Sequence, residues 1–177
     1  MKVKKLFTLL MLCAGIAVFA GCSQKDPVAA DTDVQEELKE YVIDGVGTLY
    51  LPEGFSVESG VTEEGLPMHY AEFNKDSLFI GLNRFGADAY EAAGVPLPED
   101  LDDYSTRAGV RQGLPEDAEF TRDSYDNLFV KFSDGGETNY QYLKKGTDSY
   151  GAFIIICPEG EEDDETFALW ASKAILE

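Results

Sequence analysis

The chain has 177 residues, of which 34 are Asp or Glu and 14 are Lys or Arg, so its formal net charge is −20. Hydrophobic residues make up 44% and aromatic residues 12%, which is enough for one folded domain with a core. The acidity argues against a nucleic-acid binder, because such proteins hold phosphates with Lys and Arg. One His and three Cys leave few nitrogen and sulfur ligands for zinc. We therefore expect no metal, no cofactor and no nucleic-acid partner.

The N-terminus carries the most specific pattern of the sequence. Lysines at positions 2, 4 and 5 precede an apolar stretch at residues 6–19, and the chain turns polar directly after Cys22. A basic start, a short apolar stretch and small residues at its end are typical of a secretory signal peptide. The stretch is too short for a comfortable membrane span. We expect residues 1–21 to be a signal that is removed on export.

The end of this signal, Val18-Phe19-Ala20-Gly21-Cys22, resembles the bacterial lipobox, with Phe19 where Leu is usual. The resemblance implies that the signal is cut before Cys22 and that the Cys22 thiol carries a diacylglycerol. Two or three acyl chains give stable anchoring, so it also implies a cell-membrane location on the extracytoplasmic face. The alternative is an ordinary signal peptide with an incidental cysteine.

A hydrophilic segment follows the cysteine. Residues 23–40 hold Pro27, several acids and few large apolar side chains. We interpret residues 22–40 as the lipidated cysteine and a tether, with a reach of about 23 Å for a flexible chain. A short helix at residues 34–41 is an alternative. After cleavage, 11 basic and 34 acidic residues leave a net charge of −23, which an anionic leaflet repels. The single globular domain should span residues 41–177.

The first half of this domain mixes strands and short helices. Residues 47–51 alternate and run through a Pro-Glu-Gly turn into residues 55–57, which predicts a hairpin. Two further strands are expected at residues 68–73 and 77–85, and a short helix at residues 87–93. Pro98 and four acids predict the start of a helix at residues 101–112 that ends at Gly113. The acids are Glu99, Asp100, Asp102 and Asp103.

The second half predicts an antiparallel meander and a last helix. Short turns, including Gly135-Gly136, separate strands at residues 119–123, 128–133, 138–145 and 150–157. Residues 152–157 are apolar on both faces, as in a central strand that is covered on both sides. Phe167, Trp170, Ala171, Ala174 and Ile175 recur at helical spacing. The predicted class is α+β, with an antiparallel sheet covered by helices.

This order of elements resembles the PsbP-like family. The residues that carry the resemblance are the Gly-Thr-Leu-Tyr-Leu-Pro-Glu-Gly-Phe segment at 47–55, the helix with an acidic start at 101–112 and the closing stretch at 153–176. The resemblance implies an α/β/α sandwich in which the closing helix packs an aromatic residue, here Trp170, against the sheet. Members of the family act by binding partners, so it implies no catalytic residue.

Three groups of residues are candidates for chemistry. The acids Glu161, Glu162, Asp163, Asp164 and Glu165 could hold Ca²⁺, but an acidic helix N-terminus explains them better. His69 is the single histidine and has no nucleophile motif beside it, so we expect an ordinary strand residue. Cys157 has an acidic and apolar neighbourhood, so we expect a buried, unreactive thiol. With 34 acids, no single carboxylate pair indicates glycoside chemistry.

We therefore expect a monomeric lipoprotein whose only modified residue is Cys22 and whose domain is a non-catalytic binding or assembly module. Its partner would be an unidentified envelope protein, reached from the membrane through the lipid anchor. One alternative is a lipoprotein that binds a small molecule or a cation, as an accessory to a transporter. The other is an envelope hydrolase, which would need a pocket with convergent polar groups.

Overall fold

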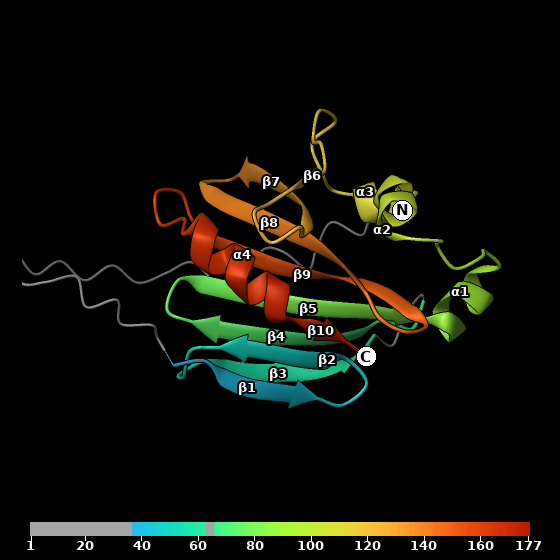
Figure 1. Cartoon of the computed structure of the whole chain (residues 1–177), viewed down its shortest axis with the longest axis horizontal. Coiled ribbons are helices and arrows are strands. Elements are labelled where there is room, and N and C mark those ends of the chain that lie inside the picture. Colours follow the sequence, from blue (N-terminus) through green and yellow to red (C-terminus); the bar gives the residue numbers. More distant parts are fainter. Residues whose placement is uncertain (1–36, 63–65) are drawn as a thin grey trace, which may run out of the picture. The chain divides into compact units, whose positions relative to one another are not determined.

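The computed structural model describes residues 37–62 and 66–177 and confirms the α+β class (Figure 1). Its larger sheet has seven strands, all antiparallel, in the order β3-β4-β5-β9-β8-β7-β6. These strands are β3 (Ser56–Val61), β4 (His69–Lys75), β5 (Leu78–Gly86), β6 (Thr121–Arg122), β7 (Leu128–Asp134), β8 (Glu137–Lys145) and β9 (Ser149–Pro158).

A second, three-stranded sheet has the order β1-β2-β10, with β1 (Lys39–Ile43), β2 (Gly47–Leu51) and β10 (Ile175–Leu176). The helices are α1 (Ala87–Ala93), α2 (Leu101–Thr106), α3 (Ala108–Arg111) and α4 (Asp164–Lys173). Figure 1 shows α4 lying across the large sheet, beside the small sheet. The two sheets and the four helices are therefore arranged around the central strand β9.

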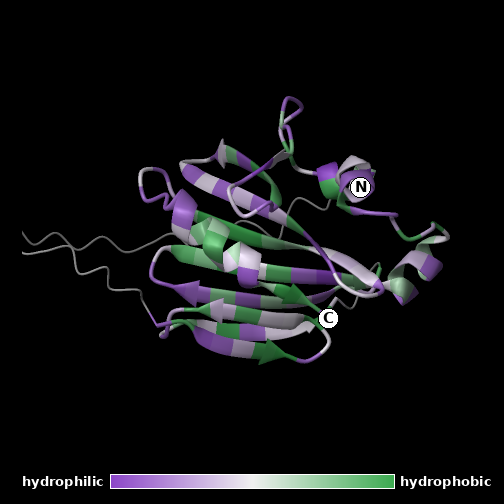
Figure 2. Ribbon diagram, in the orientation of Figure 1, coloured by the Kyte–Doolittle hydropathy of each residue, from purple (hydrophilic) through white to green (hydrophobic). Residues whose placement is uncertain are grey.

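Strand β9 is covered on both faces, as its sequence predicts. Phe153, Ile155 and Cys157 pack into a core shared with α4 and the small sheet. The alternate residues Tyr150 and Ala152 pack into a second core with α1, α2 and α3. Figure 2 shows the alternation of hydrophobic and hydrophilic residues along the outer strands, which have only one buried face.

The β7–β8 hairpin confirms the predicted glycine turn. Gly135 and Gly136 both have positive φ, at 64° and 89°, which a two-residue turn of this kind requires. The hairpin fixes the register of Phe129 opposite Tyr142 and of Lys131 opposite Tyr140. It thereby sets the positions of the aromatic residues discussed below.

Three predictions about the first half of the domain are wrong. Residues 47–51 do not form a hairpin with residues 55–57, because β2 pairs with β1 and β10 while β3 pairs with β4. The turn at Pro52 instead carries the chain from the small sheet to the large one. The tether also ends earlier than residue 40, since β1 begins at Lys39 and excludes a helix over the end of the 34–41 segment.

The expected helix at residues 101–112 is divided at Arg107, whose φ of −66° and ψ of 135° end α2. Ser105 and Thr106 donate hydrogen bonds from their hydroxyls to carbonyls three residues back, at 2.7 and 2.8 Å. Such bonds compete with the helical ladder and account for the break. Likewise, Ile175 belongs to β10 and not to the last helix. One face of the large sheet is covered partly by strands, so the helical cover expected on both faces is only partly present.

Candidate functional site

A cleft of about 400 Å³ opens between α4 and the outer strands of the large sheet. We call it the α4–β8 cleft. Its volume falls within the range usual for small-ligand pockets. Its lining residues come from the β6–β7 connection, from β7 and β8, and from the first half of α4: they are Asp123, Ser124, Phe129, Tyr140, Tyr142, Asp164, Glu165 and Ala168.

Aromatic rings form the floor of the cleft. Tyr140 and Tyr142 lie two residues apart on β8, so they share one face, and their rings are nearly parallel with centroids 6.3 Å apart. Phe129 lies opposite Tyr142 on β7, and the two rings stack at 5.1 Å. Such cross-strand aromatic pairs stabilise an antiparallel sheet. Both tyrosines are only 1% exposed, so the floor is rigid and mostly buried.

The two tyrosine hydroxyls differ in their partners. The Tyr140 hydroxyl donates a short hydrogen bond to Asp164. For the Tyr142 hydroxyl we find no hydrogen-bond partner among the described residues, although the residue lines the cleft. Among the described residues, Arg107 Nε is the one buried side-chain nitrogen or oxygen without a partner, so the Tyr142 hydroxyl is reached by solvent in the cleft.

Asp164 forms one wall of the cleft at the start of α4. The side chain of Asp163 caps the helix by accepting a hydrogen bond from the Thr166 amide at 3.0 Å. This cap places Asp164 in the first turn, where it accepts a hydrogen bond from the Lys131 ammonium at 2.9 Å. The bonds from Lys131 and Tyr140 hold the pKa of Asp164 below its usual range. Asp164 is therefore a carboxylate at neutral pH.

Asp123 forms the opposite wall, in the turn between β6 and β7. Its carboxylate accepts hydrogen bonds from the Tyr125 amide at 2.8 Å, the Asn127 amide at 3.0 Å and the Asn127 side chain at 2.9 Å. The same Asn127 side chain donates to the Ala168 carbonyl at 3.1 Å. The turn is thus fastened to α4, and the position of Asp123 is fixed before any ligand binds.

Burial and neighbouring charges set the protonation of the groups that line the cleft. Burial, followed by the charges of Asp123 and Asp164, raises the pKa of Tyr142. Burial and the bond to Asp164 raise the pKa of Tyr140 as well. Both phenols therefore stay protonated near neutral pH, while Asp164 stays ionised. The Lys131 ammonium lies 5.0 Å from the centre of the Tyr140 ring, which is a cation–π geometry.

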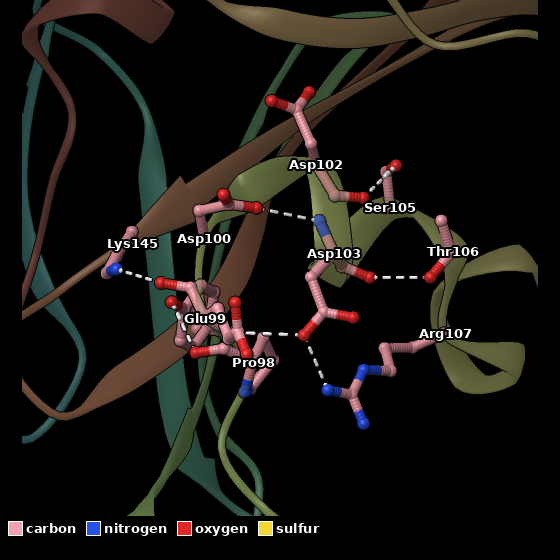
Figure 3. A network of polar contacts seen from close by, with 10 residues as sticks. Pro98, Glu99, Asp100, Asp102, Asp103, Ser105, Thr106, Arg107 and Lys145 are labelled. Carbon is pink, nitrogen blue, oxygen red and sulfur yellow. Dashed lines mark hydrogen bonds and ion pairs between the residues drawn. The ribbon is translucent and has the colours of Figure 1, made fainter.

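A second polar cluster lies at the start of α2 (Figure 3). Asp100 caps the helix by accepting from the Asp103 amide at 2.8 Å, and Asp103 pairs with Arg107 at 2.6 Å. The Lys145 ammonium donates to the Glu99 carbonyl at 2.7 Å and so ties this turn to β8. The cluster confirms the predicted helix start, although Arg107 Nε is buried without a hydrogen-bond partner among the described residues.

The acids 161–165 also lie at a helix N-terminus, as predicted. Glu162 accepts hydrogen bonds from the Thr138 hydroxyl at 2.6 Å and from the Gly160 amide at 2.8 Å, and Glu161 accepts from the Ser77 hydroxyl. Within residues 37–62 and 66–177 no group of three or more His, Cys, Asp or Glu side chains could hold a metal ion. Four of these five acids thus have partners within the fold.

Two further candidates from the sequence, His69 and Cys157, are packed as structural residues. His69 is half-buried on β4 and fits against Gly45, where an added Cβ would come within 2.8 Å of its Nδ1 atom. Cys157 is 2% exposed and unpaired, and burial raises the pKa of its thiol. The prediction of a buried thiol is confirmed, and its low reactivity stays a prediction. The lipidation candidate Cys22 lies outside the described residues.

Sequence reasoning did not find the α4–β8 cleft. The alternation of Tyr140 and Tyr142 and the acidic start of α4 are visible in the sequence, but Asp123 joins them only through the path of the β6–β7 turn. Half-buried Lys144 was also missed. Its ammonium donates to the Ala171 carbonyl at 2.5 Å near the end of α4, and burial lowers its pKa to about 8.

Compared with protein-family models, with curated proteins and with solved structures, the chain matches none of them. Among the helices of the described residues, none is long and apolar enough to cross a membrane. The N-terminal pattern and the chemistry of the cleft are therefore the features that bear on function.

Proposed function

We propose that this protein is an extracytoplasmic lipoprotein, anchored in the cell membrane through Cys22, whose domain is a non-catalytic binding module for an envelope partner. The observation that carries the proposal is the N-terminal order of three lysines, a short apolar stretch and Ala-Gly-Cys, followed at once by polar residues. A cysteine thiol at that boundary is where acyl chains give stable attachment.

The charge of the domain supports a position away from the membrane surface. Residues 37–177 hold ten Lys and Arg against thirty Asp and Glu. An anionic leaflet repels such a domain over about a Debye length, so the domain stands away from the surface that anchors it. A module held in this way is free to meet partners in the envelope.

The chemistry of the α4–β8 cleft favours binding over hydrolysis. A glycoside hydrolase needs one carboxyl group whose pKa is raised so that it can donate a proton. In the cleft, the pKa of Asp164 is lowered and those of Tyr140 and Tyr142 are raised. These groups hold their protons or charges fixed near neutral pH, as binding groups do.

We further propose that the domain is a variant of the PsbP-like α/β/α sandwich. The antiparallel sheet, the acidic start of α2 and the packing of Trp170 in α4 against the large sheet support this. The added β1-β2-β10 sheet is the main difference from a plain sandwich. The PsbP-like resemblance is consistent with action through partners.

The anchor is tested by expressing the full chain and a Cys22→Ala variant in a bacterium that processes lipoproteins. The wild-type chain should enter the membrane fraction and incorporate labelled palmitate, whereas Cys22→Ala should do neither. Ser23→Ala, one residue further along, is the matched control and should behave as the wild type. If Cys22→Ala remained in the membrane fraction after signal cleavage, the anchor would be wrong.

The partner is tested by crosslinking in intact cells and recovering the tagged, membrane-anchored chain. A reproducible envelope protein that crosslinks to the wild type, but not to a Cys22→Ala variant released from the membrane, is the expected result. Recovery of no reproducible envelope protein from the anchored chain would contradict the proposed binding role.

A further inference from the structure

We infer that the free edge of β3 binds an extended, basic segment of another protein, which adds to the large sheet as a further strand. This mode of recognition draws affinity from main-chain hydrogen bonds and specificity from alternate side chains. The inference rests on the binding role proposed above, to which it gives a surface and a partner chemistry, but it does not depend on the lipid at Cys22.

The first observation is that β3 (Ser56–Val61) is an open edge. Among the described strands it pairs only with β4, and five of its six residues are exposed. Natural proteins protect sheet edges with very short strands, with Lys or Pro, or with bulges. The opposite edge strand, β6, has only two residues. By contrast, β3 contains neither Lys nor Pro and pairs with β4 in unbroken register, so its edge can accept another strand.

The register identifies the backbone groups that an added strand would meet. The Thr62 amide donates to the Met68 carbonyl at 3.0 Å, so these two residues form a hydrogen-bonded pair next to the β3–β4 ladder. Hydrogen-bonded and non-hydrogen-bonded pairs alternate along an antiparallel ladder. The N–H and C=O groups of Val57, Ser59 and Val61 therefore point away from β4. Each of these residues offers one donor and one acceptor to an added strand.

The charge beside this edge indicates a basic partner. Glu58 on β3 lies directly opposite Glu72 on β4, and like charges in directly opposite positions destabilise a sheet. On the other side of Glu72 lies Gly81 of β5, which has no side chain to offset the charge. The ion pairs found among the described residues include neither glutamate. A Lys or Arg on an added strand, placed beside Glu58, would relieve this repulsion.

The other face of β3 indicates that the partner's side chains alternate. Val57 and Val61 point to the face opposite to Glu58 and are 43% and 47% exposed. Apolar residues on an added strand would cover them, while the residues between would be basic. A second copy of this chain does not supply such a segment, because β3 carries an acid and no base and the chain has a net charge of −20. The occupant is therefore a different protein with an alternating apolar and basic segment.

Fluorescence anisotropy of labelled peptides, titrated with the purified full chain in detergent micelles, tests the inference. The probe is a capped Val-Lys-Thr-Lys-Val-Lys peptide. One control, Val-Glu-Thr-Glu-Val-Glu, keeps the alternation and reverses the charge. The other, Val-Val-Thr-Lys-Lys-Lys, keeps the composition and loses the alternation. At about 0.15 M salt, which screens long-range attraction, the probe should bind at least tenfold more tightly than either control.

Variants assign the binding to the edge of β3. Ser59→Pro removes an N–H that points to solvent, a position that proline tolerates on an edge strand, and should weaken binding of the probe at least tenfold. Ser59→Ala keeps the N–H and should bind as the wild type does.

Glu58→Lys tests the charge separately. It replaces a repulsion from Glu72 with an attraction, so it should fold at least as well as the wild type. It should weaken binding of the basic probe about tenfold and strengthen binding of the acidic control peptide. Glu116→Lys makes the same change at an exposed position in the α3–β6 connection, on the way to the opposite edge strand, and should leave both affinities unchanged.

Amide hydrogen exchange locates the bound peptide. Binding should slow exchange at Val57, Ser59 and Val61, whereas Glu58 and Gly60 already face β4 and should change little. Equal protection of all five amides, or of none, would contradict strand addition.

Three further results would overturn the inference. They are no binding of the probe to a chain that unfolds cooperatively, equally tight binding of the unpatterned basic peptide, and self-association of the chain that Ser59→Pro abolishes. The last result would show that a second copy occupies the edge. Because the peptide assay uses the purified chain and the crosslinking experiment uses intact cells, failure of this surface and failure of the proposed binding role are distinguishable.

Discussion

Gly151 in the middle of the large sheet provides a stringent test of the packing. It lies opposite Arg84 where β9 pairs with β5, and an added Cβ would come within 1.9 Å of the Asn83 carbonyl oxygen. Contacts of a Cβ below 3.0 Å are essentially never found, so the strands would have to separate by about 1.1 Å. The Asn83 carbonyl belongs to the backbone, so it cannot move aside by a change of rotamer.

The expected loss of stability follows from the hydrogen bonds between β9 and β5. A separation of this size breaks the hydrogen bonds on either side of Gly151, and each buried group left unpaired costs about 1–3 kcal/mol. We expect Gly151→Ala to lower the free energy of unfolding by about 4 kcal/mol, at the upper end for single substitutions. Urea unfolding, followed by the fluorescence of the single Trp170 in α4, measures the change.

Gly109→Ala is the matched control. Gly109 is exposed in α3, and nothing within 4 Å would meet its added Cβ. Alanine favours helix over glycine by about 1 kcal/mol at most, so this variant should be as stable as the wild type or slightly more stable. If Gly151→Ala unfolded within 1 kcal/mol of the wild type, the close approach of β5 and β9 would be wrong.

Two further predictions concern α4 and alkaline pH. Asp163→Ala should lower the free energy of unfolding by about 1 kcal/mol through loss of the cap on Thr166; an unchanged value in the same urea assay would show that the cap adds nothing. Lys144 has a pKa of about 8 in the fold and about 10.5 when unfolded, so the unfolded chain holds the extra proton between these values and stability should rise with pH there. Lys144→Met should abolish that rise in urea midpoints measured from pH 7 to 10, and its persistence would refute the assignment. Above pH 10 stability should fall steeply, because burial raises the pKa of several tyrosines in the fold and the unfolded chain ionises first; these are Tyr90, Tyr104, Tyr140 and Tyr142.

Most of the meander was predictable from local patterns. The turn at Gly135-Gly136, the apolar run of β9 and the acidic start of α4 each follow from residues close in sequence. The partner of β2 was not predictable in this way. Strand β2 pairs with β1 and also with β10, whose residues Ile175 and Leu176 lie at the far end of the chain. The break at Arg107 depended on hydroxyl bonds that compete with the helix.

The candidate site was the least predictable part. Its tyrosines read from the sequence as ordinary core residues of a strand, which they also are. Their role as the floor of a cleft depends on Asp123, and the Asn127 bond to Ala168 brings the turn of Asp123 to α4. That contact joins residues 41 positions apart and leaves no local signal. A cysteine at the end of an apolar stretch, by contrast, is read directly from the sequence, and the position of Cys22 remains a prediction.

Intact-mass spectrometry of the exported protein, extracted from membranes with detergent, tests the central proposal most directly. The account predicts a chain that starts at residue 22 and is heavier than its amino acids by the mass of a diacylglyceryl group, with or without a further acyl chain. A free thiol at that residue, or a mature chain that starts at any other position, would contradict it.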